Sequence, residues 1–456
     1  MSISGSNREQ WGSKAGFILA ATGSAVGLGN IWRFPYLAGE NGGAAFIFVY
    51  IFCVVLIGIP VLIAEILIGR TTQKNPVGSF RTLHKSKFWR GIGGMGVVAG
   101  FVILSFYAVV AGWTLGYIFE AVTGNLLNYD IAEEASSHFV ELTASPFWNV
   151  GLLALVMILT MAIVYFGVQK GIERGSKIMM PLLFVLLIGL MFYGLTMEGS
   201  AQGLTYLFNP DWSKINTNVI LAGLGQAFFS MSLGMGAMLT YGSYMSRKEN
   251  VPTSAVWIAV LDTSVALIAG ICIFSVVFAT GQNPDVGPSL IFRTLPVVFT
   301  KMPGGYLFAI LFFVALSLAA ITSTVSLLEV TTAYFVDEKK WPRKKAVLII
   351  GTITLLLGVP SALSFSPNTS VDVFGFTFFG ITEFISSNLM LPIGGFFIAI
   401  FVGWIWGFDK VTEYVKEGSE KLFERFPWMI KGWKIVLRFI APILIIIVLL
   451  SSLGII

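Results

Sequence analysis

The chain has 456 residues, of which 56% are hydrophobic and only 12% carry a charged side chain, whereas about 25% are charged in a typical soluble protein. A soluble fold of this size has too little interior to bury so much apolar surface. The composition therefore excludes a cytosolic enzyme, a disordered chain and a secreted disulfide scaffold. The two cysteines, Cys53 and Cys272, lie in apolar runs and predict no disulfide framework. What remains is an all-α integral membrane protein.

Eleven apolar runs are long enough to cross a membrane as helices, because a hydrocarbon core of about 30 Å needs roughly 20 helical residues. None of these runs shows the alternation of apolar and polar residues that a lipid-facing barrel strand requires. The polar start of the chain has no signal-peptide pattern, so the first run is expected to remain as a span. The predicted spans are 11–37, 44–70, 91–124, 147–166, 171–194, 216–245, 252–280, 303–336, 344–363, 377–407 and 433–455.

The distribution of Lys and Arg predicts the orientation, since these residues collect in cytoplasmic loops. With a cytoplasmic N-terminus, all 29 Lys and Arg residues fall on the cytoplasmic side except Arg33, Lys214, Arg293 and Lys301. An odd number of spans then puts the C-terminus outside. We therefore expect a multi-pass protein of the plasma membrane, with the lipid bilayer as its surroundings.

Two clusters of small residues lie at mid-depth, GSAVGLGN at 23–30 in span 1 and SMSLGMG at 230–236 in span 6. Small residues at this density favour local unwinding of a helix, and paired interrupted helices in the two halves of a chain indicate a transporter binding site built from inverted repeats. Close helix packing at two small-residue faces is the alternative, and the spacing alone does not decide between the two.

Polar groups at membrane depth point to the same region. Span 8 carries Thr322, Ser323, Thr324 and Ser326, whose hydroxyls could also bond to carbonyls of their own helix. Asp262 in span 7 is harder to dismiss, because a carboxylate inside a membrane is costly and usually functional. Oxygen-rich surroundings of this kind suit a hard cation.

Enzymatic chemistry finds no support in the sequence. The only histidines, His84 and His138, fall outside the spans, no phosphate-binding GxxxxGK[ST] loop is present, and no nucleophile has an evident base beside it. We predict that the protein is not an enzyme, and no nucleic-acid partner is expected.

The segment 23–40, GSAVGLGNIWRFPYLAGE followed by NGG, resembles the first-helix signature of the neurotransmitter:sodium symporter family. The bacterial branch with eleven spans matches best. The resemblance implies a leucine-transporter-like fold with a 5+5 inverted repeat and unwound helices 1 and 6. The implied organisation is a cytoplasmic segment 1–10, a first repeat 11–194, an extracellular loop 195–215, a second repeat 216–407, a cytoplasmic amphipathic connector 408–432 and a last span 433–456.

The resemblance also implies two sodium sites. The residues of the first would be the carbonyl of Ala25 and the side chains of Asn30, Ser230 and Asp262, completed by the substrate's carboxylate. The residues of the second would be the carbonyls of Gly23, Val26 and Ala319 with the hydroxyls of Thr322 and Ser323. Asp262 stands where the family usually has Asn, and this carboxylate leads us to predict no chloride requirement.

The substrate implied by the resemblance is an amino acid. Family members that carry monoamines have an Asp at the position of Gly27, where this chain leaves room for a substrate carboxylate bonded by Tyr107. The pocket contains no charged group, so charged substrates would lose hydration without a partner, and the flexible Met235 suits varied shapes. The expected substrate-contact residues are Ala25, Gly27, Ile103, Tyr107, Phe229, Ser232, Met235 and Leu327.

Two charge pairs are implied as gates. Arg33 and Glu383 would form the outer pair, and Arg8 and Asp337 the inner pair. The aromatic residues expected beside them are Phe229 on the outside and Trp11 and Tyr244 on the inside.

Span 5 carries Gly171 and Pro181, and their spacing resembles a family motif linked to unwinding of this segment. Proline removes a helix donor and weakens the preceding turn. A normal helix with an early proline remains the alternative.

The sequence thus predicts a sodium-coupled symporter that imports neutral hydrophobic L-amino acids, aliphatic and aromatic, by alternating access. Two other classes stay open: a carrier of the same fold for another solute, such as a betaine or a nucleobase, and a membrane sensor that occludes a ligand without net transport. A channel is less favoured, since a pair of charges flanks the site on each side. The oligomeric state is not predicted.

Overall fold

The computed structural model describes residues 8–281, 290–367, 372–373 and 375–455, and these residues are almost entirely helical. Residues 1–7 of the expected N-terminal segment and Ile456 of the expected last span lie outside this described part. Within it, nine helices are long and apolar enough to cross a membrane. The nine are α3–η2–α4 (Ala44–Thr72), α6 (Lys87–Val122), α8 (Pro146–Tyr165), η4–α9 (Val168–Leu195), α13 (Val251–Ala279), α15 (Gly305–Glu338), α16 (Arg343–Leu363), α17–η8–α18–η9 (Phe378–Ile405) and α21–η10–α22 (Trp428–Ser452).

Four of these spans contain short π segments, which are η2, η4, η8, η9 and η10. The component bounds are α3 (Ala44–Cys53), η2 (Val54–Gly58), α4 (Ile59–Thr72), η4 (Val168–Glu173), α9 (Arg174–Leu195), α17 (Phe378–Glu383), η8 (Phe384–Met390), α18 (Leu391–Ile400), η9 (Phe401–Ile405), α21 (Trp428–Ile435), η10 (Val436–Ile440) and α22 (Ala441–Ser452). Such segments are frequent at functional sites.

The first predicted span is a bent pair of helices. α1 (Lys14–Ala25) begins with the Ser13 side chain capping Gly16 N–H and ends where Val26 turns extended, with ψ of 122°. The chain becomes helical again as η1 (Gly29–Arg33) and α2 (Phe34–Glu40), at 55° to α1. Counting this pair as one span brings the total to ten for the described residues.

The sixth predicted span, 216–245, consists of two short helices. α11 (Thr217–Ser230) has 14 residues and α12 (Ala237–Gly242) has six, so neither crosses a bilayer by itself. Between them the backbone takes positive φ at Ser232, Gly234 and Gly236. A Cβ on Gly234 would lie 2.1 Å from the Leu391 carbonyl oxygen, so this glycine also serves close packing against α18. Of the eleven expected spans, the described residues thus show nine long helices and one bent pair, whereas the segment 216–245 forms two short helices.

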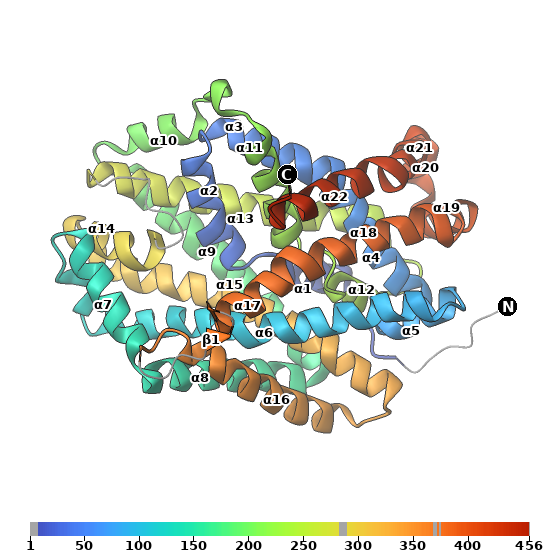
Figure 1. Cartoon of the computed structure of the whole chain (residues 1–456). Coiled ribbons are helices and arrows are strands. Elements are labelled where there is room, and N and C mark those ends of the chain that lie inside the picture. The colour runs from blue at the N-terminus through green and yellow to red at the C-terminus, as the bar shows by residue number, and fades with distance from the viewer. Residues whose placement is uncertain (1–7, 282–289, 368–371, 374, 456) are drawn as a thin grey trace.

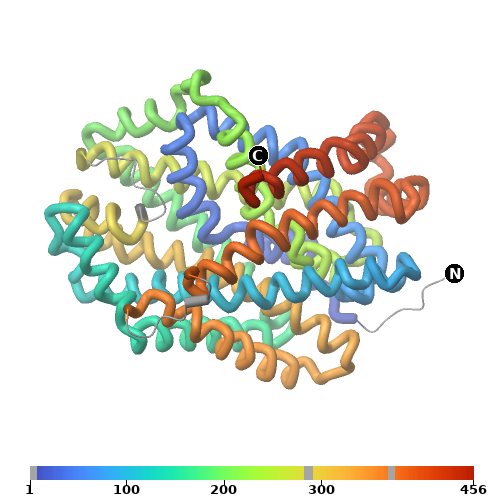
Figure 2. Tube along the Cα trace, in the orientation of Figure 1, coloured from blue at the N-terminus to red at the C-terminus, as the bar shows by residue number. Residues whose placement is uncertain are grey.

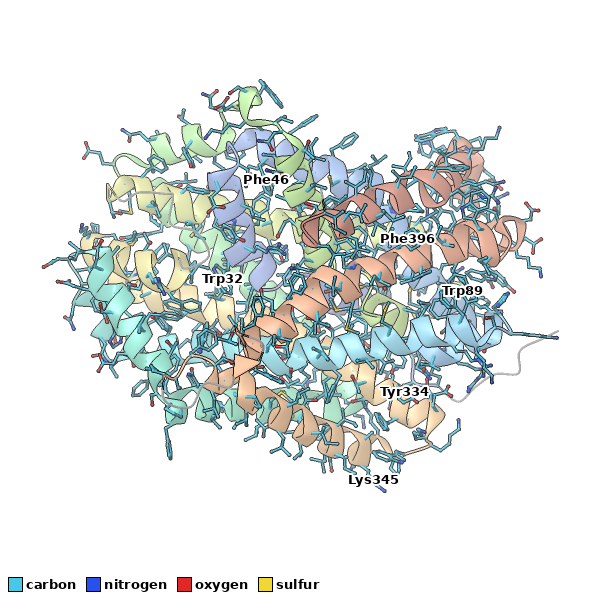
Figure 3. The ribbon with its side chains drawn as sticks, in the orientation of Figure 1. Trp32, Phe46, Trp89, Tyr334, Lys345 and Phe396 are labelled. Atoms are coloured by element: carbon cyan, nitrogen blue, oxygen red, sulfur yellow. The ribbon has the colours of Figure 1, made fainter. Side chains whose placement is uncertain are left out.

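The two ends of the helix bundle carry different short elements. In Figure 1, α7 and α14 lie at the left end, whereas α5 and α19 lie at the right end; Figure 3 shows Lys345, from a basic loop, at the lower edge to the right of centre. The short elements are α5 (Pro76–Leu83), η3 (Asn125–Leu127), α7 (Ala132–Ala144), α10 (Ser200–Phe208), η5 (Trp212–Lys214), η7 (Leu290–Thr294), α14 (Leu295–Lys301), α19 (Phe408–Lys416), α20 (Glu420–Arg425), β1 (Asp372–Val373) and β2 (Phe376–Thr377). The strands pair antiparallel, with Val373 opposite Phe376.

The centre of the bundle is formed by α6 and α15, which pack along each other and can be followed in Figure 2. In the most apolar stretch of α15, 78% of the residues are buried, against 28% in η4–α9 and 28% in α21–η10–α22. A helix that is apolar on all sides, and yet is not covered by the rest of the protein, must face lipid. α15 and α6 thus form the interior, and α9 and α22 lie at the periphery.

The predicted connector 408–432 forms α19, α20 and the start of α21. In α19 the apolar residues Phe408, Val411 and Val415 are buried while the charged residues face outward, as an amphipathic surface helix requires. Arg70, at the end of α4, holds this region through bonds from Nη1 to the carbonyls of Glu249, at 2.5 Å, and Glu417, at 2.8 Å.

Candidate binding site between the interrupted helices

A small cavity lies between the two helix breaks. Its walls come from the end of α1, from α6, from the α11–α12 break and from α15. The residues that line it are Ser24, Ala25, Gly27, Gly29, Ile103, Tyr107, Phe229, Ser230, Ser232, Met235, Ser323, Ser326 and Leu327. All eight residues that the sequence assigns to substrate contact are among them.

The cavity is polar where the α1 break faces α6 and α15. The Leu28 N–H donates to the Tyr107 hydroxyl at 3.1 Å, so this hydroxyl keeps its own hydrogen for another acceptor. A Cβ on Gly27 would lie 2.6 Å from Tyr107 Oη and 2.7 Å from Ser323 Oγ. Only glycine at position 27 leaves the backbone this close to both hydroxyls.

The first predicted sodium set gathers around one buried carboxylate. Asn30 Nδ2 donates to Asp262 Oδ1 at 2.8 Å, and Ser230 Oγ donates to Asp262 Oδ2 at 2.5 Å. Asn30 Nδ2 also lies 3.1 Å from Ser230 Oγ, and Tyr50 Oη lies 3.4 Å from Asp262 Oδ2. Ala25 lines the adjacent cavity, but among the described residues no hydrogen bond joins it to this cluster.

The second predicted sodium set comes together where the end of α1 crosses α15. Ser323 Oγ lies 3.0 Å from the carbonyl oxygen of Val26, 3.5 Å from that of Gly23 and 3.3 Å from that of Ala319. Thr322 Oγ1 donates to the Ala319 carbonyl at 2.9 Å. All five residues therefore contribute oxygen atoms to one region, as a hard cation requires.

The inner pair is closed. Arg8 makes an ion pair with Asp337, and its second guanidinium nitrogen donates to Ser243 Oγ at 2.8 Å. The same guanidinium lies 4.6 Å from the centre of the Tyr244 ring, and the Trp11 indole N–H donates to the Tyr241 carbonyl at 2.9 Å. The residues predicted for this gate, Arg8, Asp337, Trp11 and Tyr244, thus form one contact layer.

The outer pair is open. Arg33 and Glu383 line one vestibule of about 840 Å³, but within the described chain no ion pair of 4.0 Å or less joins them. The Arg33 guanidinium instead lies 5.1 Å from the centre of the Phe229 ring. Trp32, which also lines the vestibule, is labelled to the left of centre in Figure 3. The aromatic residues of the vestibule are Trp32, Tyr36, Phe106, Tyr107, Trp113, Phe139, Phe229, Phe292, Phe365, Phe376, Phe379 and Phe384.

Span 5 is helical throughout its predicted hinge. Gly171 lies in η4 and Pro181 inside the continuous helix α9. A Cβ on Gly171 would lie 2.0 Å from the Ile163 carbonyl oxygen, so this glycine permits α8 and η4 to touch. Unwinding between Gly171 and Pro181 is absent from this conformation of the described chain and stays a prediction.

Two buried carboxylates of the site region were missed in the sequence. Glu65 Oε1 accepts from the Gly234 N–H in the α11–α12 break at 2.7 Å. Glu329 makes an ion pair with Arg343 and accepts from the Tyr244 hydroxyl at 2.5 Å. The signal that singled out Asp262, an acid inside an apolar span, applied equally to both.

The N-terminal segment is also fixed to the start of span 5, which the sequence did not indicate. Glu173 accepts from Gly12 N–H at 2.6 Å and from Ser13 Oγ at 2.9 Å, and Glu9 accepts from Val168 N–H at 2.7 Å.

The described residues form a bundle of long apolar helices with a cavity between two interrupted ones, which is the arrangement of a multi-pass membrane transporter. The model of the Sodium:neurotransmitter symporter family matches residues 8–141 and 138–455. The chain belongs to this family of sodium-dependent transporters, and it is not an enzyme.

Individual relatives agree with this assignment. The sodium-dependent transporter YhdH of Bacillus subtilis (strain 168) is 40% identical over 448 residues, which cover 98% of each chain. A sodium-dependent transporter of Haemophilus influenzae is 34% identical over 99% of this chain and 100% of its own. The crystal structure of MhsT in complex with L-phenylalanine superposes with a TM-score of 0.87 at 50% identity, over 98% of this chain and 100% of MhsT. The chain thus closely resembles MhsT, the Bacillus multi-hydrophobic amino acid transporter, and this match confirms the resemblance to the bacterial branch of the family that the sequence indicated.

Proposed function

We propose that the protein is a sodium-coupled symporter that imports neutral hydrophobic L-amino acids, aliphatic and aromatic, across the plasma membrane. The observation that carries this proposal is the cavity between the helix breaks, whose described lining contains no Asp, Glu, Lys, Arg or His. Charged substrates would lose their hydration there without a partner, whereas apolar side chains gain about 25 cal/mol for each Å² buried. The bound L-phenylalanine of MhsT supports the same substrate class.

The backbone of the substrate would be held by the polar side of the cavity. The Tyr107 hydroxyl donates to the substrate's carboxylate, and carbonyls freed at the α1 and α11 ends accept from its amino group. The apolar side of the cavity, Ile103, Met235 and Leu327 among its residues, receives the side chain. Met235 is unbranched and repacks around different shapes, which favours broad selection.

Sodium would bind at the two oxygen clusters. In the first, the Asn30 amide rotates so that its oxygen, in place of Nδ2, faces Ser230 and Asp262, and the substrate's carboxylate completes the shell. The second uses the oxygen atoms of Gly23, Val26, Ala319, Thr322 and Ser323. Because Asp262 supplies a negative charge beside the first ion, no chloride is required.

The topology that fits this function has eleven spans with a cytoplasmic N-terminus and an extracellular C-terminus. α1 with α2 is the first span and α11 with α12 the sixth, and these occupy corresponding positions in two inverted repeats of five. The inner pair is joined and the outer pair is apart, so the present conformation is the one that admits substrate from outside. Alternating access exchanges these two states.

Uptake into proteoliposomes tests the proposal. The purified protein is reconstituted, and accumulation of labelled L-leucine and L-phenylalanine is followed with an inward sodium gradient or with potassium in its place. We expect concentrative uptake only with sodium, and mutual competition among leucine, phenylalanine and tryptophan. Saturable binding without accumulation would instead identify a sensor, and failure of amino acids to compete would identify a carrier of another solute.

A further inference from the structure

Four buried serines connect the substrate cavity to the second oxygen cluster. Ser232, in the α11–α12 break, donates from Oγ to the Ser24 carbonyl at 2.7 Å. Ser24 Oγ, at the end of α1, donates to Ser326 Oγ on α15 at 2.8 Å, and Ser326 Oγ donates to the Ser323 carbonyl at 2.9 Å. Each of the four side chains is at most 7% exposed, so water does not replace these bonds.

The direction of these hydrogen bonds is fixed, because a hydroxyl has one hydrogen. Ser326 Oγ donates its hydrogen to the Ser323 carbonyl and therefore accepts the hydrogen bond from Ser24 Oγ. The nearest acceptor for the single hydrogen of Ser323 Oγ is the Val26 carbonyl at 3.0 Å, and the carbonyls of Ala319 and Gly23 lie at 3.3 and 3.5 Å. These carbonyls are the oxygens proposed to bind the second sodium.

A cation bound at this position would act on the Ser323 end of these hydrogen bonds. Ser323 Oγ would bind it through a lone pair, so the Ser323 hydrogen would no longer be donated to the Val26 carbonyl, which could then bind the cation as well. Both changes would occur where the end of α1 contacts α15, which is where Ser24 meets Ser326. The strained Ser232, with φ of 53°, is attached to the same end of α1 through the Ser24 carbonyl.

We propose that Ser24 and Ser326 are positioning residues that transmit occupancy of the second sodium site to the substrate cavity, an inference that rests on the proposed function. Neither residue belongs to the proposed sodium sets or to the expected substrate contacts. Their shared hydrogen bond keeps the α1 break and the α11–α12 break in register with α15 when sodium is bound. Substrate and sodium thereby strengthen each other's binding by the same factor, as linkage requires.

The test measures the sodium dependence of binding. Equilibrium binding of labelled L-phenylalanine to the purified full-length protein gives its Kd at low and at saturating sodium, and the ratio of the two values is the coupling factor. We expect Ser326→Ala and Ser24→Ala each to lower this ratio about fivefold, the effect of one buried neutral hydrogen bond. The double variant should lower it no further, because both changes remove the same bond.

Ser317→Ala is the matched control. Ser317 lies on the same helix, is equally buried, and donates to Thr114 Oγ1 at 2.8 Å, away from the cavity, so its variant should keep the wild-type ratio. A purely structural role of Ser24 and Ser326 would weaken both Kd values equally and leave the ratio unchanged, and that result would overturn the inference. Should one variant fail to fold, the other removes the bond from the opposite side.

The wild-type measurement separates this inference from the function on which it rests. If wild-type protein binds L-phenylalanine without any dependence on sodium, the proposed function fails and this inference with it. If wild-type binding depends on sodium and the variants keep the wild-type ratio, only the coupling role fails.

Discussion

Asp262 is the side chain to which we assign the proposed independence from chloride. Its carboxylate is fully buried and receives hydrogen bonds from Asn30 and Ser230. An unpaired charge in such surroundings is costly, so a monovalent cation beside it is strongly favoured.

We expect Asp262→Asn to raise the sodium concentration for half-maximal uptake about tenfold, because the variant loses the attraction between a carboxylate and an adjacent cation. Initial uptake rates of labelled leucine over a sodium series measure this. In wild-type protein, replacing chloride by gluconate should leave uptake unchanged. Collapse of wild-type uptake in gluconate would contradict the role given to this carboxylate.

Gly27 tests the close approach of the α1 break to α6 and α15. Gly27→Ala puts a methyl group at 2.6 Å from Tyr107 Oη and 2.7 Å from Ser323 Oγ, so we expect L-phenylalanine affinity to fall about tenfold or more through overpacking of the site. Gly225→Ala is the control, because its Cβ meets nothing within 4 Å. Equal effects of the two substitutions in a binding assay would refute the argument.

At the scale of elements, the sequence and the structure agree where local chemistry decides. The small residues at 23–30 and 230–236 favoured two helix breaks but left close helix packing as an alternative, and the helices are interrupted in both segments. The hydroxyls at 322–326 pointed to the same region but left bonding within their own helix as an alternative. Asn30, Ser230 and Asp262, far apart in the sequence, were joined only through a family resemblance, since no periodicity brings three different helices together.

Other elements were beyond prediction because they depend on packing or on conformational state. The break between α11 and α12 brings the backbone of Gly234 against the Leu391 carbonyl, a tertiary contact that the sequence does not reveal. The separation of Arg33 from Glu383 reflects the state of the transporter, whereas the sequence contains only the charges. The π segments do not follow from side-chain type.

Unwinding of span 5 between Gly171 and Pro181 is a prediction about a single element. Pro181→Ala restores a helix donor and strengthens the preceding turn, so we expect it to slow sodium release to the inside while the equilibrium Kd for L-phenylalanine changes less than twofold. Stopped-flow measurement of sodium-dependent tryptophan fluorescence follows the release. Pro360→Ala, inside α16, is the matched control. A changed Kd with unchanged release would reject the hinge.

At the scale of the whole molecule, the proposed alternating access requires the inner and the outer pair to close in turn, and the inner pair is the one joined in this conformation. Arg8 and Asp337 are largely buried, with side-chain exposures of 8% and 20%, whereas the neighbouring pair of Arg81 and Glu338 has 48% and 12%. Exposed pairs contribute about 0–1 kcal/mol, and removing one partner of a buried pair costs more.

We therefore expect Arg8→Ala to open the inner side, to reduce uptake about tenfold and to speed hydrogen exchange in residues 8–13 and 168–173. Mass spectrometry of exchanged peptides measures the opening. Arg81→Ala should leave both readouts near wild type. Unchanged exchange in Arg8→Ala would show that the pair does not hold the layer closed.

The cavity is walled by the continuous helices α6 and α15 and by the two interrupted segments at the ends of α1 and α11, so an occupant adds contacts among four parts of the chain. A ligand that binds only the folded state raises the free energy of unfolding by RT ln(1 + [L]/Kd), which is about 2.7 kcal/mol when the ligand concentration is a hundred times Kd. The unfolding temperature of the detergent-purified protein, measured with each of the twenty common amino acids in sodium and in potassium, would consequently rank the substrates without reconstitution into vesicles.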